Sequence, residues 1–201
     1  LYSLQTGERD WQTALGRILK YVKQLPEEPF ASFFFVPTLL GDVIFGLNTE
    51  DGSQIDARLL SDGTLRCLAA LTALETVAEH SRVVLEEFDN GLHPSRVGML
   101  TQAILEISKR RKLKVLVTTH NPATLDSLTP EQLQGVVVCF WDKAQKASRL
   151  LPLLEIPKAD VLLERGQLGD LVTQRILEQH LEPGFAEAQQ KKAKAWLESL
   201  K

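Results

Sequence analysis

The stretch that decides the fold comprises residues 82–96, which read RVVLEEFDNGLHPSR. Its Val-Val-Leu run favours a core strand, yet the run is followed at once by the adjacent carboxylates of Glu86 and Glu87. Because a buried charge costs several kcal/mol unless a cation accompanies it, two acids are not expected inside a core strand. We therefore predict a buried strand whose carboxyl end presents acid to a cation or to a water, at the place where open α/β sheets bind ligands.

The residues that follow predict a second strand of the same kind. The turn Asp89-Asn90-Gly91 leads to a helix that Pro94 opens, and Lys109-Arg110-Arg111 suits the dipole at the end of that helix. Residues 114–119 form the next predicted strand, which ends at Thr118-Thr119-His120, and Asn121-Pro122 starts another helix. Strand, helix, strand and helix in this order predict parallel neighbours, so both polar strand ends should lie on one edge of one sheet.

The N-terminal part predicts a helix followed by a small antiparallel layer. Residues 10–25 carry a helical apolar stripe that ends at Pro26. Residues 32–36 and 43–47 are short β-type runs, and the alternation Ile55, Ala57, Leu59 indicates a further strand after a hairpin turn.

The pattern changes from strand to helix at residues 59–64, which read LLSDGT. Ser61 is a good N-cap, Asp62 favours the first turn, and a largely apolar run up to residue 78 predicts a buried helix. Gly63 permits close approach to the helix N-terminus, which is a natural anion site. A well-capped core helix without a ligand is the alternative explanation.

The C-terminal part predicts a buried strand at residues 135–141, paired with residues 148–154, and then helices. The stripe Leu168, Leu171, Val172, Ile176 and Leu181 indicates one helix that Pro183-Gly184 ends, and Trp196, Leu197 and Leu200 have helical spacing in the last segment. We interpret the basic cluster Lys191-Lys192-Lys194 as a solvated face, with nucleic-acid binding as the alternative.

Bulk properties indicate a soluble globular protein. The chain has 201 residues, of which 44% are hydrophobic and 24% charged, enough for one domain with a small appendage. Its formal charge of -3 gives no global electrostatic footprint for nucleic acid or an anionic membrane. Cys67 and Cys139 lie in apolar surroundings, and we expect buried free thiols in a reducing cytoplasm. No apolar run could span a bilayer, and a first residue that is Leu suggests a fragment or a processed chain.

Three motifs stand in a set order: LLSDGT at 59–64, VVLEEFDNGLHP at 83–94 and VLVTTH at 115–120. Their order and spacing resemble the C-terminal half of an ABC-type ATPase head, in the soluble group that contains SMC proteins, double-strand-break repair ATPases and overcoming-lysogenization-defect (OLD) proteins. The resemblance covers residues 59–128 closely. It implies an α/β, three-layer P-loop NTPase with a mostly parallel sheet and flanking helices. It also divides the chain into the end of a preceding lobe (1–59), the ATPase core (60–156) and a helical extension (157–201).

The resemblance assigns roles to individual residues. Glu87 matches the catalytic glutamate that polarises the attacking water, and His120 matches the switch histidine that reaches the γ-phosphate. Glu86 stands where these proteins usually have the Walker B aspartate that supports Mg²⁺, and it is one methylene longer. The remaining matches are nucleotide-contacting residues, in the signature of the opposite subunit or in the D-loop: Ser61, Asp62, Gly63, Asp89 and Asn90. His93 is read as an interface or structural residue rather than a catalytic one.

One departure limits what the chain could do alone. No G-x-x-x-x-G-K-[ST] motif occurs in it, since the glycines at 41 and 46 are followed by Leu47-Asn48, and no Q-loop glutamine can be placed. The resemblance therefore implies that ATP and Mg²⁺ are held together with a Walker A lobe from elsewhere and with a second head, in a homodimer. We expect this chain alone to be inactive. A nuclease or other effector, and DNA, are further implied partners; a membrane is not, and the expected location is cytoplasmic.

Other functions stay open at this point. A metal-dependent hydrolase would use Glu86, Glu87, His93 and His120 as ligands, but would leave the LSDG segment without a role. A non-hydrolysing ABC-like scaffold or sensor would use ATP only to hold two subunits together. A transporter head fits the residues after Glu87 less well, and paired glutamates without function would leave the agreement of three motifs unexplained.

Overall fold

The computed structural model describes residues 1–6, 9–26, 29–143, 145–181, 185, 191, 195–196 and 198. The chain divides into two compact units, Leu1–Thr124 (unit 1) and Leu125–Lys201 (unit 2), each with a hydrophobic core of its own. The helices and strands of unit 1 are, in chain order, α1 (Tyr2–Thr6), α2 (Arg9–Val22), β1 (Phe30–Pro37), β2 (Val43–Thr49), β3 (Gln54–Asp56), a 3₁₀ turn (Ala57–Leu59), α3 (Asp62–Thr76), β4 (Arg82–Leu85), α4 (Pro94–Arg111) and β5 (Lys114–Val117). Helix α5 (Pro122–Asp126) crosses the boundary between the units.

The predicted antiparallel layer is present. β1 pairs with β2 and β2 with β3, all antiparallel. The third strand is shorter than predicted: it ends at Asp56, and Ala57 and Leu59 lie in the 3₁₀ turn instead of continuing the alternation. The reason is local capping, because the Asp56 carboxylate accepts a hydrogen bond from the backbone N–H of Arg58 at 2.9 Å and so starts the turn.

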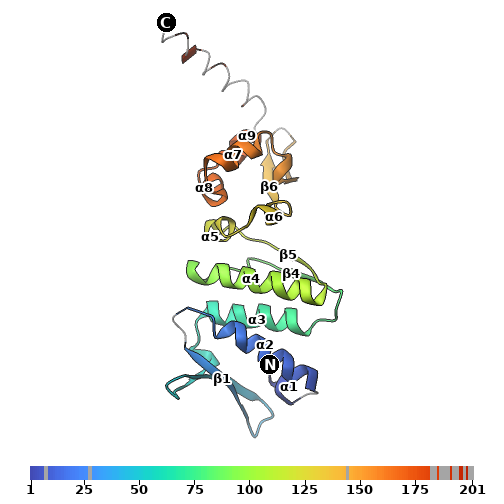
Figure 1. The fold of residues 1–201 in the computed structure, drawn as a ribbon, viewed down its shortest axis with the longest axis vertical. Coiled ribbons are helices and arrows are strands. Elements are labelled where there is room, and N and C mark those ends of the chain that lie inside the picture. Colours follow the sequence, from blue (N-terminus) through green and yellow to red (C-terminus); the bar gives the residue numbers. More distant parts are fainter. Residues whose placement is uncertain are drawn as a thin grey trace. The chain divides into compact units, whose positions relative to one another are not determined.

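Helix α3 forms the centre of unit 1 and lies between α2 and α4 (Figure 1). Ser61 caps it as predicted, and most of its apolar side chains are buried, Leu71 and Leu74 completely. The helix ends at Thr76, two residues before the predicted end. Its burial among helices explains why the sequence is apolar around most of its circumference.

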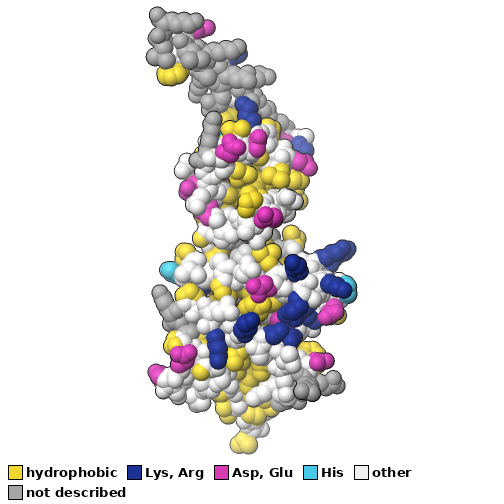
Figure 2. Space-filling view, viewed as in Figure 1, with side chains coloured by type: hydrophobic (Ala, Val, Ile, Leu, Met, Phe, Trp, Pro, Cys, Tyr) yellow, Lys and Arg dark blue, Asp and Glu magenta, His cyan; other side chains and the backbone are white. Residues whose placement is uncertain are grey.

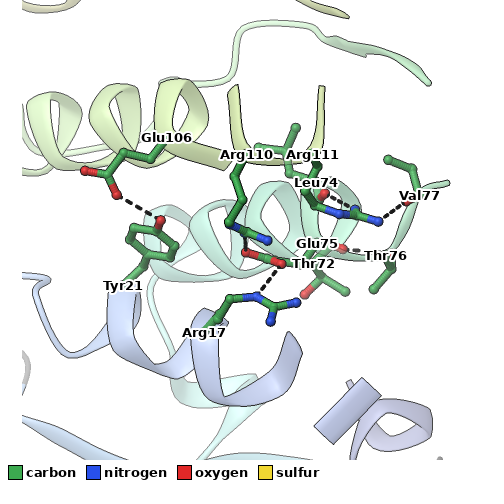
Figure 3. Close-up of polar contacts among 10 residues, drawn as sticks. All are labelled: Arg17, Tyr21, Thr72, Leu74, Glu75, Thr76, Val77, Glu106, Arg110 and Arg111. Atoms are coloured by element: carbon green, nitrogen blue, oxygen red, sulfur yellow. Dashed lines mark hydrogen bonds and ion pairs between the residues drawn. The ribbon is translucent and has the colours of Figure 1, made fainter. Parts of the chain in front are cut away.

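A charged cluster ties these three helices together (Figure 3). The carboxylate of Glu75 on α3 is fully buried and accepts hydrogen bonds from Arg17 on α2, at 2.9 Å, and from Arg110 on α4. Beside it, the Tyr21 hydroxyl of α2 donates to Glu106 on α4 at 3.0 Å. Glu75 therefore has the two cations that a buried carboxylate requires.

Strands β4 and β5 form a parallel pair, as predicted, with Val83 opposite Val115. One face packs on the core of unit 1 through these two valines. The other face is open: Val84 is 59% and Leu116 is 61% exposed. The predicted buried strand is therefore buried on its inner face only. β4 pairs with β5 alone among the described residues, and nothing described there covers their outer face.

Unit 2 contains α6 (Pro130–Leu133), β6 (Val137–Asp142), β7 (Ala147–Pro152), a 3₁₀ turn (Leu153–Glu155), α7 (Ala159–Arg165), α8 (Leu168–Thr173) and α9 (Ile176–Leu181). β6 and β7 pair antiparallel as predicted. β6 is not buried, however: its side chains alternate between exposed and half-buried, and Cys139 is exposed, whereas Cys67 is buried as predicted.

The predicted single helix over residues 168–181 is two helices. The chain breaks between α8 and α9, where Arg175 adopts the left-handed backbone conformation with φ of 57°. Several predictions fall outside the described residues: the stop at Pro183-Gly184, Leu197 and Leu200 of the last stripe, and Lys192 and Lys194 of the basic cluster.

The fold class is mixed α/β with a parallel strand pair and flanking helices, as predicted. No helix in the described part of the chain is long and apolar enough to cross a membrane. The division of the chain at residues 59/60 and 156/157 stays a prediction, since it concerns the limits of an ATPase core rather than of compact units.

Candidate functional site

The candidate site lies where β4 and β5 end side by side. The pairing continues one step past the strands, because the backbone N–H of Thr118 donates to the carbonyl of Leu85 at 3.0 Å. Glu86 and Glu87 follow β4, and His120 follows the end of β5. The parallel arrangement thus brings both polar strand ends to one edge, as the order of elements predicted.

Glu87 is the most restrained residue of this edge. Its backbone has a φ of 43°, which is uncommon for a residue other than glycine, and its N–H donates to the Thr118 hydroxyl at 2.9 Å. Its carboxylate accepts a hydrogen bond from the Asn90 amide at 3.1 Å, and its other oxygen lies 3.9 Å from Nδ1 of His120. Both side chains are open to solvent, at 54% for Glu87 and 79% for His120. The carboxylate is therefore positioned and accessible.

The two acids are not buried, and they stand at the carboxyl end of the strand as predicted. Glu86 and Glu87 are both exposed in the turn after β4, and Glu86 makes no hydrogen bond within the described part of the chain. The physical reason is again the open face of the strand pair, because a strand end loses its water only when further layers surround it. The carboxylates need no cation for their stability in this chain.

Asp89 differs from its neighbours, because its carboxylate points into unit 1. It is 3% exposed and accepts hydrogen bonds from the hydroxyls of Thr119, at 2.5 Å, and Thr124. Thr119 in turn accepts a hydrogen bond from the backbone N–H of Asn121 at 3.0 Å. Asp89 therefore fixes the segment around His120 relative to the acidic turn. Its assignment as a nucleotide-contacting D-loop residue stays a prediction.

The LSDG segment begins α3 with a defined hydrogen-bond pattern. The Ser61 hydroxyl accepts a hydrogen bond from the backbone N–H of Thr64 at 3.1 Å and lies 2.8 Å from the Thr64 hydroxyl. Arg96, from α4, donates to that Thr64 hydroxyl at 3.1 Å. Ser61 and Asp62 are exposed, so the N-terminus of the helix faces solvent. These features suit an anion at the helix start.

Gly63 connects this segment to the acidic turn. A Cβ on Gly63 would lie 2.8 Å from the carbonyl oxygen of Gly91 and 3.1 Å from the side chain of Leu92. The glycine is thus required for close packing between α3 and the turn that also contains Asn90 and Glu87. Contact of Gly63 with phosphate, the role that the resemblance implies, stays a prediction.

The structure also adds residues that the sequence does not mark as part of the site. Arg96 and Thr124 lie outside the three motifs, and Thr64, Thr118 and Thr119 belong to motifs without a predicted role of their own. All of them are polar residues that act on neighbours distant in sequence, as Arg96 does on Thr64. Two threonines directly after a strand were the one available signal, since their hydroxyls can satisfy the turn of an adjacent strand.

No preformed metal centre accompanies the site. Within the described residues, no group of three or more His, Cys, Asp and Glu side chains could hold a metal ion. A cavity of about 260 Å³ lies in unit 2, lined by Leu162, Gly166, Asp170, Leu171, Gln174, Ile176 and His180, and contains none of the predicted site residues. The exposed carboxylates of Glu86 and Glu87 fit the way Mg²⁺ is usually bound beside phosphates, by one or two carboxylates and retained waters.

Comparison with solved structures shows the fold of SMC ATPase heads. A structure from work on ATP-driven dimerisation and DNA-stimulated activation of SMC ATPases matches with a TM-score of 0.54 and 14% identity, over 77% of this chain and 91% of that one. The Smc head domain of Pyrococcus yayanosii, with its coiled coil and joint, matches with a TM-score of 0.52 and 15% identity, over 77% of this chain and 29% of that chain. The Smc head domain of Pyrococcus furiosus, with an extended coiled coil and bound to the C-terminal domain of ScpA, matches with a TM-score of 0.50 and 14% identity, over 77% of this chain and 38% of that chain.

The sequence itself identifies the family. The chain belongs to the family described as AAA domain, putative AbiEii toxin, Type IV TA system, which matches residues 8–126. No curated protein matches the chain. The match contains every predicted site residue, from Ser61 to His120. The resemblance to a soluble ABC-type, SMC-like ATPase head is thereby confirmed, and with it membership of a nucleotide-binding class of ATPases.

Proposed function

We propose that this chain supplies the signature segment, the acidic strand end and the switch histidine of an ABC-type ATPase head that dimerises around ATP and Mg²⁺. The observation that carries the proposal is the arrangement at the end of β4. There the Glu87 carboxylate is held by Asn90, lies 3.9 Å from His120 and remains open to solvent. A general base for water attack must be accessible and oriented in this way.

Each residue then has a distinct task. Glu87 orients and partly deprotonates the attacking water, and His120 donates to the γ-phosphate. Glu86 supports Mg²⁺ through its waters; the ion, when bound, offsets the negative charge of the phosphates. Ser61 and the N-terminus of α3 face the nucleotide held by the other head, where a hydroxyl and helix N–H groups favour an anion.

We infer that a second lobe, with the phosphate-binding loop, covers the outer face of β4 and β5. Val84 and Leu116 on that face are more than half exposed, although parallel sheets are normally covered on both faces. The absence of a Walker A motif from these 201 residues agrees with this inference. Without such a lobe the chain lacks the loop that binds the β- and γ-phosphates, so we expect it not to hydrolyse ATP alone.

The biological setting follows from the resemblance. We place the head in the cytoplasm, in a DNA-repair, chromosome-maintenance or anti-phage defence complex, with a nuclease or other effector and DNA as partners. A non-hydrolysing scaffold is the second candidate, and the positioned Glu87 favours hydrolysis over it.

The test compares Glu87→Gln with the unchanged protein in the complete head, with its phosphate-binding lobe. We expect turnover to fall at least 100-fold, as general-base removal costs about 10²–10⁴-fold, while ATP-dependent dimerisation persists. Glu106→Gln, an exposed glutamate on α4, is the matched control and should leave both unchanged. Equal turnover by Glu87→Gln and the unchanged head would refute the proposal, as would ATP hydrolysis by the 201-residue chain alone that Glu87→Gln abolishes.

A further inference from the structure

Unit 2 contains a cavity of about 260 Å³ that three short helices surround. Its walls are formed by α7, α8 and α9 and by Gly166 in the loop between α7 and α8 (Figure 1). Arg175, whose left-handed backbone is unfavourable for a residue other than glycine, turns the chain between α8 and α9 so that these two helices pack together. We call this hollow the unit 2 cavity.

The floor of the unit 2 cavity is apolar. Leu162 and Leu171 are 5% and 4% exposed and belong to the hydrophobic core of unit 2, and Ile176 packs against that core. The volume of the cavity is below the range of about 300–1,000 Å³ that is usual for the pockets of drug-sized ligands. The cavity therefore suits a short aliphatic chain rather than a large ring system.

Three polar side chains line the same cavity: Asp170 on α8, Gln174 at the C-cap of α8 and His180 on α9. The side chains of Asp170 and Gln174 have no hydrogen-bond or ion-pair partner within the described part of the chain. Nδ1 of His180 donates to the carbonyl of Ile176 at 2.8 Å. Because a carbonyl oxygen can only accept, the proton of the neutral ring lies on Nδ1, and Nε2 keeps its lone pair.

The unit 2 cavity thus combines an apolar floor with acceptors and one negative charge. A primary ammonium group donates three hydrogen bonds and accepts none. Three acceptors of the lining match it: the Asp170 carboxylate, the Gln174 carbonyl and Nε2 of His180. We propose that the unit 2 cavity binds a primary alkylammonium group, carried by a small free amine or by a lysine side chain, with the carbon chain on Leu162 and Leu171.

Other classes of ligand fit this lining less well. A carboxylate or phosphate would meet the charge of Asp170 and no Lys or Arg among the described residues of the lining. Figure 2 shows acidic side chains spread over unit 2, whereas Lys and Arg side chains gather on unit 1. An uncharged apolar ligand would remove water from Asp170 without replacing its hydrogen bonds. A metal ion would find too few ligands, since the described residues contain no group of three or more His, Cys, Asp and Glu side chains that could hold one.

The unit 2 cavity contains none of the residues of the proposed ATPase site, so its test needs no nucleotide and its outcome is independent of that function. The experiment measures binding of pentylammonium chloride to the full-length protein by saturation-transfer difference NMR, at constant pH and ionic strength. Pentanol has the same carbon chain without the charge, and sodium pentanoate has the opposite charge. A titration with Nα-acetyllysine methylamide distinguishes a lysine side chain from a free amine as the source of the ammonium group.

We expect pentylammonium to bind with a dissociation constant in the millimolar range and at least about 10-fold more tightly than pentanol or pentanoate. Asp170→Asn should weaken binding by about 10-fold or more, since hydrogen bonds to a charged group are the stronger ones. Asp160→Asn is the matched control, because Asp160 is an exposed residue of α7 that does not line the cavity, and it should leave the affinity unchanged.

The inference is overturned if pentanol binds as tightly as pentylammonium, or if Asp170→Asn and Asp160→Asn bind pentylammonium equally well. It is also overturned if neither pentylammonium nor the lysine derivative binds in the millimolar range. Tighter binding of the lysine derivative assigns the unit 2 cavity to a protein ligand, and tighter binding of pentylammonium assigns it to a free amine.

Gly166→Val separates binding from folding, because it adds bulk to the wall of the cavity and removes no polar group. The backbone at Gly166 is extended, with φ of -173°, and a Cβ there would meet no atom within 4 Å, so the urea midpoint should not change. Binding of pentylammonium should nevertheless weaken by about 10-fold or more, as is usual when methyl groups occupy the volume of a ligand. A stable variant that binds as tightly as before would contradict the inference.

Discussion

Replacing the buried Glu75 by Gln should destabilise unit 1 by about 2–3 kcal/mol. Removing one partner of a buried ion pair costs about 3–5 kcal/mol when the remaining charge stays buried. Here the remaining charges are Arg17 and Arg110, whose side chains are 36% and 41% exposed, so water can solvate them again and the cost falls. Gln also keeps the shape of Glu and can accept one hydrogen bond with its carbonyl oxygen, which limits the loss further.

The assay is urea unfolding followed by circular dichroism, together with amide hydrogen exchange of α3, which reports on unit 1 alone. Glu106→Gln provides the matched control: Glu106 is exposed and binds Tyr21, so the same change should cost less than about 0.5 kcal/mol. Adding Arg17→Met should cost less in the Glu75→Gln background than in the unchanged protein, because the pair is already broken. Equal effects of Glu75→Gln and Glu106→Gln would show that the buried cluster does not stabilise the helices.

Two further predictions concern single positions. Gly63→Ala should destabilise the protein by about 1–3 kcal/mol, since the new methyl group would lie 2.8 Å from the Gly91 carbonyl oxygen. Gly98→Ala, at a helix position with open space around it, should instead stabilise the protein by about 0.5–1 kcal/mol. The urea midpoints of the two variants test both predictions, and an unchanged midpoint for Gly63→Ala would contradict the role of Gly63 in packing. The hydrogen bonds from Arg58 lower the pKa of Asp56 from 3.8 to about 2, so the stabilisation is present above pH 3.8 and is lost as the pH falls through about 2. An NMR titration should find this midpoint, and Arg58→Ala should raise it towards 3.8; a midpoint that Arg58→Ala leaves unchanged would refute the assigned cause.

Local signals in the sequence predicted the elements of unit 1 well. The Ser61 cap, the proline at the start of α4 and the order of strand and helix each act within a few residues, and each is present in the structure. The C-terminal end of β3 was placed wrongly, because apolar alternation through Ala57 and Leu59 outweighed the cap that Asp56 provides. Short-range hydrogen bonding decided that boundary, and periodicity does not detect it.

Burial was the property that the sequence predicted least well. The sequence of an apolar strand is the same whether one or both of its faces are covered, so Val84 and Cys139 were both expected to be buried. What covers a strand depends on other layers of the protein, and in this chain the β4–β5 pair has one described layer on it, on its inner face. The contacts of Asp89 were equally hidden, because Thr119 and Thr124 lie 30 and 35 residues away along the chain.

The sequence by itself determined the order of the elements, their caps and the set of three motifs, because these depend on the chemistry of neighbouring residues. Only the tertiary structure decided which of the motif residues meet. It brought Glu87 near His120, packed Gly63 against Gly91 and turned Asp89 inward. These contacts depend on how α3, α4 and the parallel strands pack, and packing across dozens of residues is set by the whole core and not by any one segment.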